Sequence, residues 1–139
     1  MRVALGSDEG TPLVEHIRMV LSERGHDVVE IAVGEPWPAV GRAVGSAVAE
    51  GSADRGVVCC WTGTGVSIAA NKVPGVRAAL CTDATTAAGA RQWNDANVLA
   101  MGLRLTSPEV ATEMIDAFLG TEPQPSELDV IATVEPDGP

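Results

Sequence analysis

Residues 56–71 read GVVCCWTGTGVSIAAN, and this stretch decides the fold. The run from Gly56 to Cys60 is apolar throughout, which is typical of a strand buried on both faces of a sheet. The segment WTGTG that follows it is a glycine-rich turn, and a short helix is predicted from Val66 to Asn71. A buried strand that passes through such a turn into a helix is the repeating unit of a parallel α/β fold.

Short apolar strands and amphipathic helices alternate on both sides of this stretch. Thr11 and Pro12 offer a helix N-cap and a proline at the first helical position, and Ser107 and Pro108 repeat that pair near the other end. Because parallel neighbours need crossover connections, we predict a single α/β domain whose sheet is covered by helices on both faces. The predicted strands are 2–6, 27–33, 56–60, 76–81 and 97–101, and the predicted helices are 12–24, 38–50, 66–71, 83–93 and 108–119.

A change in composition near residue 120 divides the chain. Residues 1–104 hold eleven acidic and nine basic residues, whereas residues 105–139 hold eight acidic residues and no basic one. Four of the nine prolines also lie after Gly120. We therefore expect one domain over residues 1–120 and an acidic, proline-rich tail over 121–139, with a short helix between Ser126 and Val134.

The net charge of −10 narrows the classes of partner. A chain this acidic, without a basic patch, is repelled by phosphate backbones and anionic lipids, so we expect no nucleic-acid or membrane partner. The opening MRVALGS lacks the apolar core of a signal peptide, and no apolar run is long enough to cross a bilayer. The cytoplasm is the expected location.

Three cysteines fit neither a disulfide framework nor a zinc site. Cys59 and Cys60 are adjacent, Cys81 stands apart, and the chain has only two histidines. We expect no metal and no cofactor. Strand alternation places Cys59 and Cys60 on opposite faces, with Cys59 in the core and Cys60 just before a helix, where the helix dipole favours a thiolate. Cys60 is thus either a nucleophile or base, or a buried structural thiol; Cys81 is expected to be structural.

Three loops are expected at the edge of the sheet where ligands of parallel α/β folds bind, beyond the carboxyl ends of the strands. They read GSDEGT, CCWTGTG and QWND. In the second, Thr62 to Gly65 lead into a helix, so backbone N–H groups can hold a phosphate or a developing oxyanion. The alternative is a glycine turn that only lets strand and helix pack closely. A nucleotide-binding function is disfavoured, because the loop lacks a GK[ST] ending and has Ile68 where G-x-G-x-x-G needs its third glycine.

The strings GVVCCWTGTGVSIAANKVPGVRAAL and RQWNDANVLAMGLR, with an opening strand that ends in GSD, resemble the ribose-5-phosphate isomerase B and galactose-6-phosphate isomerase family. The resemblance covers roughly residues 1–120. It implies a Rossmann-like three-layer sandwich with a five-stranded parallel sheet, assembled as a homodimer or a higher homo-oligomer. It also implies aldose–ketose interconversion of a phosphosugar, without a metal, through an enediolate.

The resemblance assigns roles to individual residues. Cys60 matches the cysteine that abstracts the proton in one branch of the family, and Asn94 matches the asparagine of a catalytic His-Asn pair. Asp8 matches a substrate-binding aspartate. The oxyanion loop is matched by Thr62, Gly63, Gly65 and Ser67, and Thr64 within this loop is also expected to bind substrate. The chemistry is coherent, because a proton next to a carbonyl becomes removable when preorganised donors hold the resulting oxyanion.

Several positions depart from the family pattern. Glu9 stands where the family has a phosphate-binding histidine, and Trp93 stands where it has the histidine of ring opening. Trp61 replaces a glycine, Trp37 replaces a tyrosine, and no arginine follows Gly120. These departures predict a substrate that is less anionic and more apolar than a phosphosugar, with Glu9 and the three tryptophans around it. The alternative for each tryptophan is packing in the core or in a dimer interface.

Two functions of different classes remain open at this point. The first is an isomerase with Cys60 as base and an altered substrate. The second is a catalytically inactive relative that kept the fold as a binding or regulatory module, because indole at position 93 cannot shuttle protons.

Overall fold

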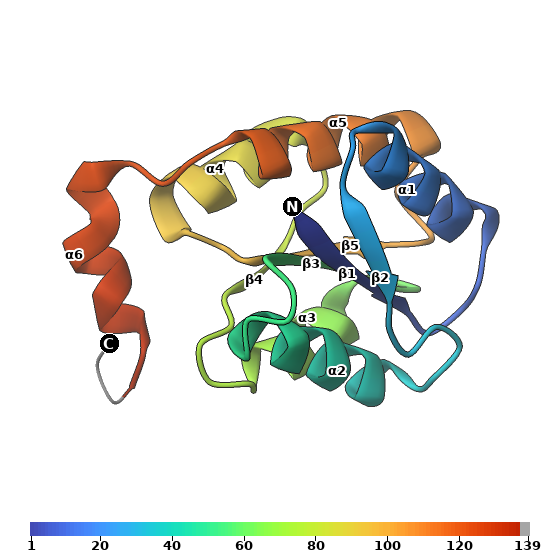
Figure 1. Cartoon of the computed structure of the whole chain (residues 1–139), viewed down its shortest axis with the longest axis horizontal. Helices are drawn as coiled ribbons and strands as arrows, with labels where there is room; N and C mark the ends of the chain where they lie inside the picture. The colour runs from blue at the N-terminus through green and yellow to red at the C-terminus, as the bar shows by residue number, and fades with distance from the viewer. Residues whose placement is uncertain (137–139) are drawn as a thin grey trace.

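The computed structural model describes residues 1–136 and confirms the alternation of strands and helices (Figure 1). Its strands are β1 (Arg2–Ser7), β2 (Asp27–Glu30), β3 (Arg55–Cys60), β4 (Ala78–Leu80) and β5 (Val98–Gly102). Its helices are α1 (Pro12–Glu23), α2 (Trp37–Ala49), α3 (Thr64–Asn71), α4 (Ala84–Asn94), α5 (Pro108–Gly120) and α6 (Leu128–Ile131), the last flanked by 3-10 turns at Pro125–Glu127 and Ala132–Val134.

All five strands are parallel, in the order β2-β1-β3-β5-β4. The chain leaves β1 towards β2 on one side and then returns to β3 on the other, so the strand order reverses between β1 and β3. Ser7 pairs with Cys59, and Cys60 pairs with Gly102, which brings the carboxyl ends of β1, β3 and β5 to one edge. Ligands of open α/β sheets bind at such a reversal.

Helices cover both faces of the sheet, as the sequence predicts. In Figure 1, α1, α4 and α5 lie on one side and α2 and α3 on the other. Each layer has its own apolar core, and the adjacent residues Cys59 and Cys60 belong to different cores, the first under α1, α4 and α5 and the second under α2 and α3. The fold is thus the predicted three-layer α/β sandwich.

Side-chain caps fix where several helices begin. Thr11 accepts a hydrogen bond from the Val14 N–H, and Ser107 accepts one from the Val110 N–H, each directly before a proline. Asp83 caps α4 through the Thr86 N–H at 2.7 Å. These residues satisfy N–H groups that the first helical turn leaves without partners.

Three predicted boundaries were wrong. Strand β2 ends at Glu30 rather than at residue 33, because Ala32 has a φ of 58° and Gly34 a φ of 87°, which extended backbone does not allow. Strand β4 spans only Ala78–Leu80, because residues 73–76 form a turn. Helix α3 starts at Thr64, two residues before the predicted Val66, because Gly63 caps it in a left-handed conformation.

The segment after α5 consists of short helical turns that project beside the body of the molecule (Figure 1). Of the predicted tail over 121–139, the structure describes residues up to 136. Arg77 ties this segment to the domain through ion pairs to Glu135 at 3.1 Å and to Asp95 at 3.2 Å. Over residues 1–136, the structure contains no helix that is both long and apolar enough to cross a membrane.

Candidate active site

An open hollow of about 380 Å³ lies where the strand order reverses, at the carboxyl ends of β1 and β3. Residues from β3, from the turn after it, and from the starts of α2 and α3 form its wall. The lining residues are Asp8, Trp37, Cys60, Trp61, Thr62, Thr64, Gly65 and Ile68. Seven of these eight residues are among the site residues that the sequence predicts.

Cys60 is the cysteine that faces this hollow. It is the last residue of β3 and is 5% exposed. Cys59 points into the opposite core, where burial and the nearby Cys60 and Asp8 raise its pKa to about 12. Burial, with the charge of Asp83, raises the pKa of Cys81 to about 11. Both of these thiols therefore stay protonated at neutral pH, and both are structural, as expected.

The turn between β3 and α3 is held in place by contacts with the loop after β5. The Leu103 N–H donates to the Cys60 carbonyl, and the Arg104 N–H donates to the Trp61 carbonyl, both at 2.9 Å. A Cβ atom on Gly102 would lie 2.9 Å from the Thr62 backbone, so only glycine allows this close approach. The two loops position the turn rigidly beside Cys60.

The first turn of α3 directs polar groups towards the hollow. Thr64 and Gly65 open the helix, and their N–H groups donate to no acceptor within residues 1–136. The Thr62 and Thr64 hydroxyls share a hydrogen bond of 2.8 Å. Free N–H groups at a helix N-terminus next to a thiol can stabilise an oxyanion formed by proton abstraction.

Ser67 does not join this group, although the sequence places it in the oxyanion loop. It lies in the second turn of α3, and its N–H donates to the Gly63 carbonyl at 3.3 Å. Its N–H is therefore used inside the helix, and the residue is absent from the wall of the hollow. Gly63 lies behind the wall and sets the turn, with a φ of 79°.

Asp8 lines the same hollow as Cys60 and directly follows the last residue of β1. Its N–H donates to the Cys59 carbonyl at 3.2 Å, which fixes its backbone. One carboxylate oxygen, Oδ1, is buried without a hydrogen-bond partner within residues 1–136. Burial, and then the charge of Glu9, raise the pKa of the Asp8 carboxyl above its ordinary value. Such an oxygen is free to accept a hydrogen bond from a ligand.

Glu9 is exposed beside Asp8 rather than within the wall. Its N–H and its carbonyl both bond to the hydroxyl of the buried Ser7, at 3.3 Å and 2.7 Å. The main chain at Glu9 is therefore anchored while the side chain points to solvent.

Two of the three tryptophans meet at the hollow. Trp37 and Trp61 line it, with 44% and 59% of their surfaces exposed. A Cβ atom on Gly65 would lie 2.8 Å from the Trp37 ring, so the indole packs against the bare backbone of α3. The ring and the first turn of α3 form one continuous wall.

Trp93 and Asn94 lie elsewhere in the single chain. They line a separate hollow of about 420 Å³ between β4 and α4, and the Trp93 ring packs over Gly89. The sequence places both residues next to Cys60, and the structure of one chain does not bring them there.

Sequence reasoning missed Ile68 and Arg104. Ile68 follows Thr64 by four residues and so shares its helix face, a spacing that could have revealed it. Arg104 is exposed, forms no ion pair within residues 1–136, and lies next to the turn through its bond to Trp61. Arg104 follows the predicted strand 97–101, and this position beyond the carboxyl end of a strand could have indicated it. Over the same residues, no cluster of three or more His, Cys, Asp or Glu side chains could hold a metal ion.

Comparison with known proteins agrees with this architecture. Residues 3–130 match the family model described as Ribose/Galactose Isomerase. Ribose-5-phosphate isomerase B of Escherichia coli is 39% identical over 126 residues, covering 87% of this chain and 85% of that protein. Galactose-6-phosphate isomerase subunit LacB of Clostridium acetobutylicum is 39% identical over 134 residues, covering 91% of this chain and 76% of that protein.

The likeness extends to a solved structure. Ribose-5-phosphate isomerase B of Clostridium thermocellum has a TM-score of 0.91 and 38% identity, with 96% of this chain and 95% of that chain covered. The family model spans most of the chain, and the sequence and structural relatives agree with it. The chain therefore belongs to the ribose/galactose isomerase family.

Proposed function

We propose that the chain is a cytoplasmic aldose–ketose isomerase that moves a proton through an enediolate, with Cys60 as the base. The observation that carries this proposal is the Cys60 thiol facing the same hollow as the free N–H groups of the α3 first turn. A base beside preorganised oxyanion donors is the combination that proton abstraction next to a carbonyl requires. The reaction needs no redox cofactor, because only protons are exchanged with the protein.

The proposed step balances within the substrate. The Cys60 thiolate takes the proton from the carbon beside the carbonyl, and the C–H electron pair forms the double bond of the enediolate. The displaced carbonyl electrons stay on oxygen, where the N–H groups of Thr64 and Gly65 and the Thr62 hydroxyl stabilise them. The neighbouring hydroxyl passes its proton to this oxyanion as it becomes the new carbonyl, and the thiol returns its own proton to the former carbonyl carbon. Asp8 binds a substrate hydroxyl through its unpartnered oxygen.

The proposed substrate is less anionic and more apolar, on the side that meets Asp8 and Glu9, than the phosphosugars named for the relatives. A carboxylate at Glu9 repels a phosphate dianion. Trp37 and Trp61 offer exposed indole faces on which the apolar face of a sugar ring can stack. The relatives' names differ in the sugar, so the family alone does not fix this choice.

We propose further that the active unit is a homodimer. Asn94 retains its proposed catalytic function only if it reaches the Cys60 of a second copy, because it lines a different hollow in its own chain. Trp93 would enter the same shared site. Each hollow also has an exposed apolar residue in its wall, Ile68 beside Cys60 and Leu80 beside Asn94, and such residues suit an interface.

The test is isomerisation of a panel of sugars in D₂O, with and without an acidic group, followed by NMR. The wild type should exchange the proton next to the carbonyl of at least one sugar, and Cys60→Ala should slow this by about a hundredfold or more. Cys81→Ala, which removes a buried thiol under α4, is the matched control and should retain activity. Turnover of ribose 5-phosphate near that of an ordinary family member would overturn the altered-substrate part of the proposal.

The second candidate is an inactive relative that serves as a binding or regulatory module. Indole at position 93 favours it, since Trp93 cannot supply the proton transfer expected of a histidine there. Alkylation at neutral pH separates the two. Cys60 reacting faster than a free thiol supports the isomerase, and a rate no faster than a free thiol supports the inactive module.

A further inference from the structure

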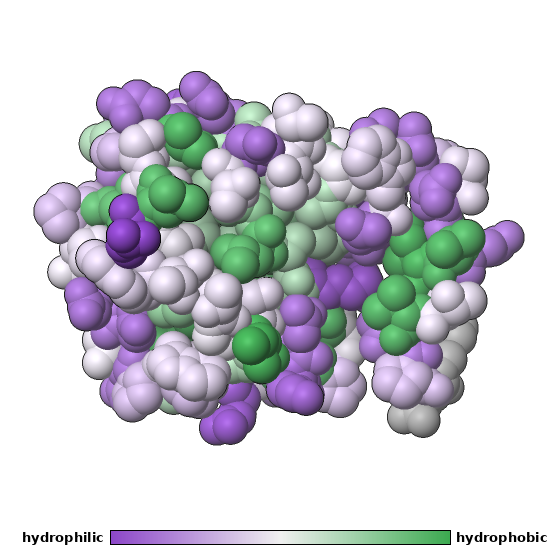
Figure 2. Space-filling view, turned by 180° about the vertical axis from the view of Figure 1, so that it is seen from behind, coloured by the Kyte–Doolittle hydropathy of each residue, from purple (hydrophilic) through white to green (hydrophobic). Residues whose placement is uncertain are grey.

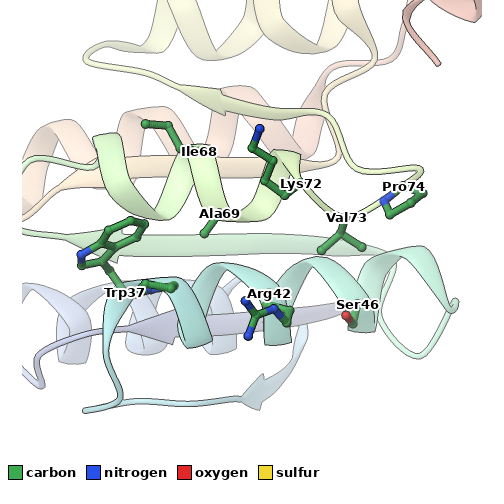
Figure 3. Close-up of a pocket in the computed structure, with 9 residues that line it drawn as sticks. Trp37, Arg42, Ser46, Ile68, Ala69, Lys72, Val73 and Pro74 are labelled. Atoms are coloured by element: carbon green, nitrogen blue, oxygen red, sulfur yellow. The ribbon is translucent and has the colours of Figure 1, made fainter. Parts of the chain in front are cut away.

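A second hollow of about 470 Å³ adjoins the candidate active site along the groove between α2 and α3. The two helices touch backbone to backbone beneath it. A Cβ atom on Gly41 would lie 2.5 Å from the Ala69 Cβ, and one on Gly45 would lie 3.1 Å from a Val73 methyl. This contact fixes the floor of the groove, whose lining is Trp37, Pro38, Arg42, Ser46, Ile68, Ala69, Lys72, Val73 and Pro74 (Figure 3).

The groove is electropositive in an otherwise acidic molecule. Neither α2 nor α3 contains an acidic residue, although the chain has nineteen. Arg42 and Lys72 are exposed and form no ion pair or side-chain hydrogen bond within residues 1–136. By contrast, five other arginines are ion-paired: Arg2, Arg18, Arg24, Arg77 and Arg91. The two cations are therefore available to an anionic ligand.

The groove is continuous with the hollow that holds Cys60. Trp37 and Ile68 line both. Arg42 lies five residues beyond Trp37 on α2, and Lys72 lies four residues beyond Ile68 on α3, so each cation is about 6–8 Å along its helix from a shared residue. Each cation therefore lies one to two helical turns from a residue that also lines the hollow of Cys60.

Figure 3 shows Arg42 and Lys72 on opposite walls of the groove, one on each helix, with the Lys72 ammonium directed away from Arg42. Both side chains are long and exposed, so rotation about their side-chain bonds brings the charged groups over the groove. The ring of Trp37 stands at the end of the groove that leads to Cys60.

We infer that the α2–α3 groove is the subsite for one acidic group of the substrate, held by Arg42 and Lys72 while the sugar carbon skeleton crosses Trp37 towards Cys60. The identity of this ligand as substrate rests on the proposed isomerase function. The arrangement separates the charge of the substrate from Glu9. A carboxylate or a sulfonate, each with less charge than a phosphate dianion, satisfies this chemistry.

Anion binding tests the subsite independently of catalysis. Inorganic phosphate and, separately, sulfate are titrated into the protein while ¹H–¹⁵N NMR follows the Arg42 Nε–H and the Trp37 indole N–H. We expect saturable shifts at both. Arg42→Gln and Lys72→Gln should each weaken binding by about tenfold, and the double variant should abolish it. Arg24→Gln, which removes the same charge from the opposite helix layer, is the control and should bind phosphate within about twofold of the wild type.

Kinetics then test the link to the substrate. With an acidic sugar that the enzyme isomerises, Arg42→Gln should raise KM by about tenfold and leave kcat nearly unchanged. The subsite would be overturned, whether or not the protein isomerises a sugar, by either of two results. One is phosphate affinity that neither substitution changes, and the other is NMR shifts at Arg104 and Asp8 instead of Arg42. Phosphate binding at Arg42 in a protein that isomerises no sugar would overturn the isomerase proposal and leave the anion site standing.

Discussion

At the scale of single residues, the charged carboxyl of Asp8 destabilises the folded protein but leaves an oxygen free to bind a ligand. Its Oδ1 atom is buried without a partner within the described residues, and burial together with Glu9 raises its pKa. A group in this state makes the folded protein less stable whenever it is charged. Such sites are retained where a ligand supplies the missing hydrogen bond, which agrees with the substrate-binding position proposed for Asp8.

Asp8→Asn should therefore stabilise the protein at pH 7 and impair it as an enzyme. Because the folded-state pKa of Asp8 lies above its ordinary value, the folded chain binds this proton more tightly than the unfolded chain does. The free energy of unfolding falls as pH rises through the window between the two pKa values and stays lowered at neutral pH. Uncharged asparagine escapes this loss. We expect a higher Tm at pH 7, no gain at about pH 3, and kcat/KM lower by about tenfold or more.

Asp83 supplies a control of opposite sign. Its pKa is lowered by the hydrogen bond from the Thr86 N–H, so its contribution to stability is present at neutral pH and lost as pH falls through the folded-state pKa. Asp83→Ala should lower the Tm at pH 7. An Asp8→Asn protein that melts below the wild type at pH 7 would contradict our reading of the Asp8 environment.

At the scale of elements, the turn between β3 and α3 positions the candidate active site. Gly63 turns the chain with a φ of 79°, and the helix that starts at Thr64 then aims its first N–H groups at the hollow beside Cys60. A Cβ atom at Gly63 would lie 2.6 Å from the Leu80 Cδ1 and 2.8 Å from the Met101 carbonyl carbon. The left-handed angle and the close approach both require glycine.

Gly63→Ala should destabilise the protein by about 2 kcal/mol or more and lower kcat, because the turn must shift away from Cys60. Thermal unfolding and the isomerase assay measure the two effects. Gly120→Ala is the matched control: no atom lies within 4 Å of its Cβ position, and its φ is not left-handed. We expect this control to be neutral or slightly stabilising. Equal losses from both substitutions would mean that the turn has no special requirement.

The sequence was sufficient for the order of elements and for the wall around Cys60, because these depend on local signals. Alternation along one strand separated Cys59 from Cys60, and Thr11 and Ser107 marked helix starts. The sequence was insufficient for features that depend on individual backbone angles or on contacts between residues far apart in the chain. The left-handed backbone at Ala32 ends β2 before the predicted residue 33. Because α3 begins at Thr64, the Ser67 N–H donates to the Gly63 carbonyl inside the helix and is not available to a ligand.

At the scale of the whole molecule, charge and apolar surface are distributed unevenly. The acidic segment after α5 is attached through Arg77, which pairs with Glu135, and through the buried Arg91, which donates to the Thr121 carbonyl at 3.1 Å. Figure 2 shows apolar side chains gathered on this projecting segment, where Leu128, Val130 and Val134 are 48–65% exposed. The sequence located this acidic segment but could not show that basic residues of the domain hold it.

The separation of Asn94 from Cys60 within one chain leads to a test of the whole assembly. If each active site takes Cys60 from one copy and Asn94 from the other, Cys60→Ala and Asn94→Ala homodimers should both be inactive. Mixing them under conditions that exchange subunits should restore activity, because each heterodimer contains one site with both residues intact. Random exchange makes about half of the dimers heterodimeric, so we expect about a quarter of the wild-type specific activity.

A mixture of Cys60→Ala with Asp8→Asn supplies the control, since Cys60 and Asp8 line the same hollow of one chain. In that mixture, each heterodimer has one site with the Cys60 substitution and one with the Asp8 substitution, so mixing should restore no activity. Activity restored in the first mixture but not in this one requires sites that combine Cys60 and Asp8 of one copy with Asn94 of the other. If the first mixture stays inactive while size-exclusion chromatography with native mass spectrometry shows exchanged dimers, Asn94 does not act across the interface. Its assignment to the catalytic site would then be withdrawn.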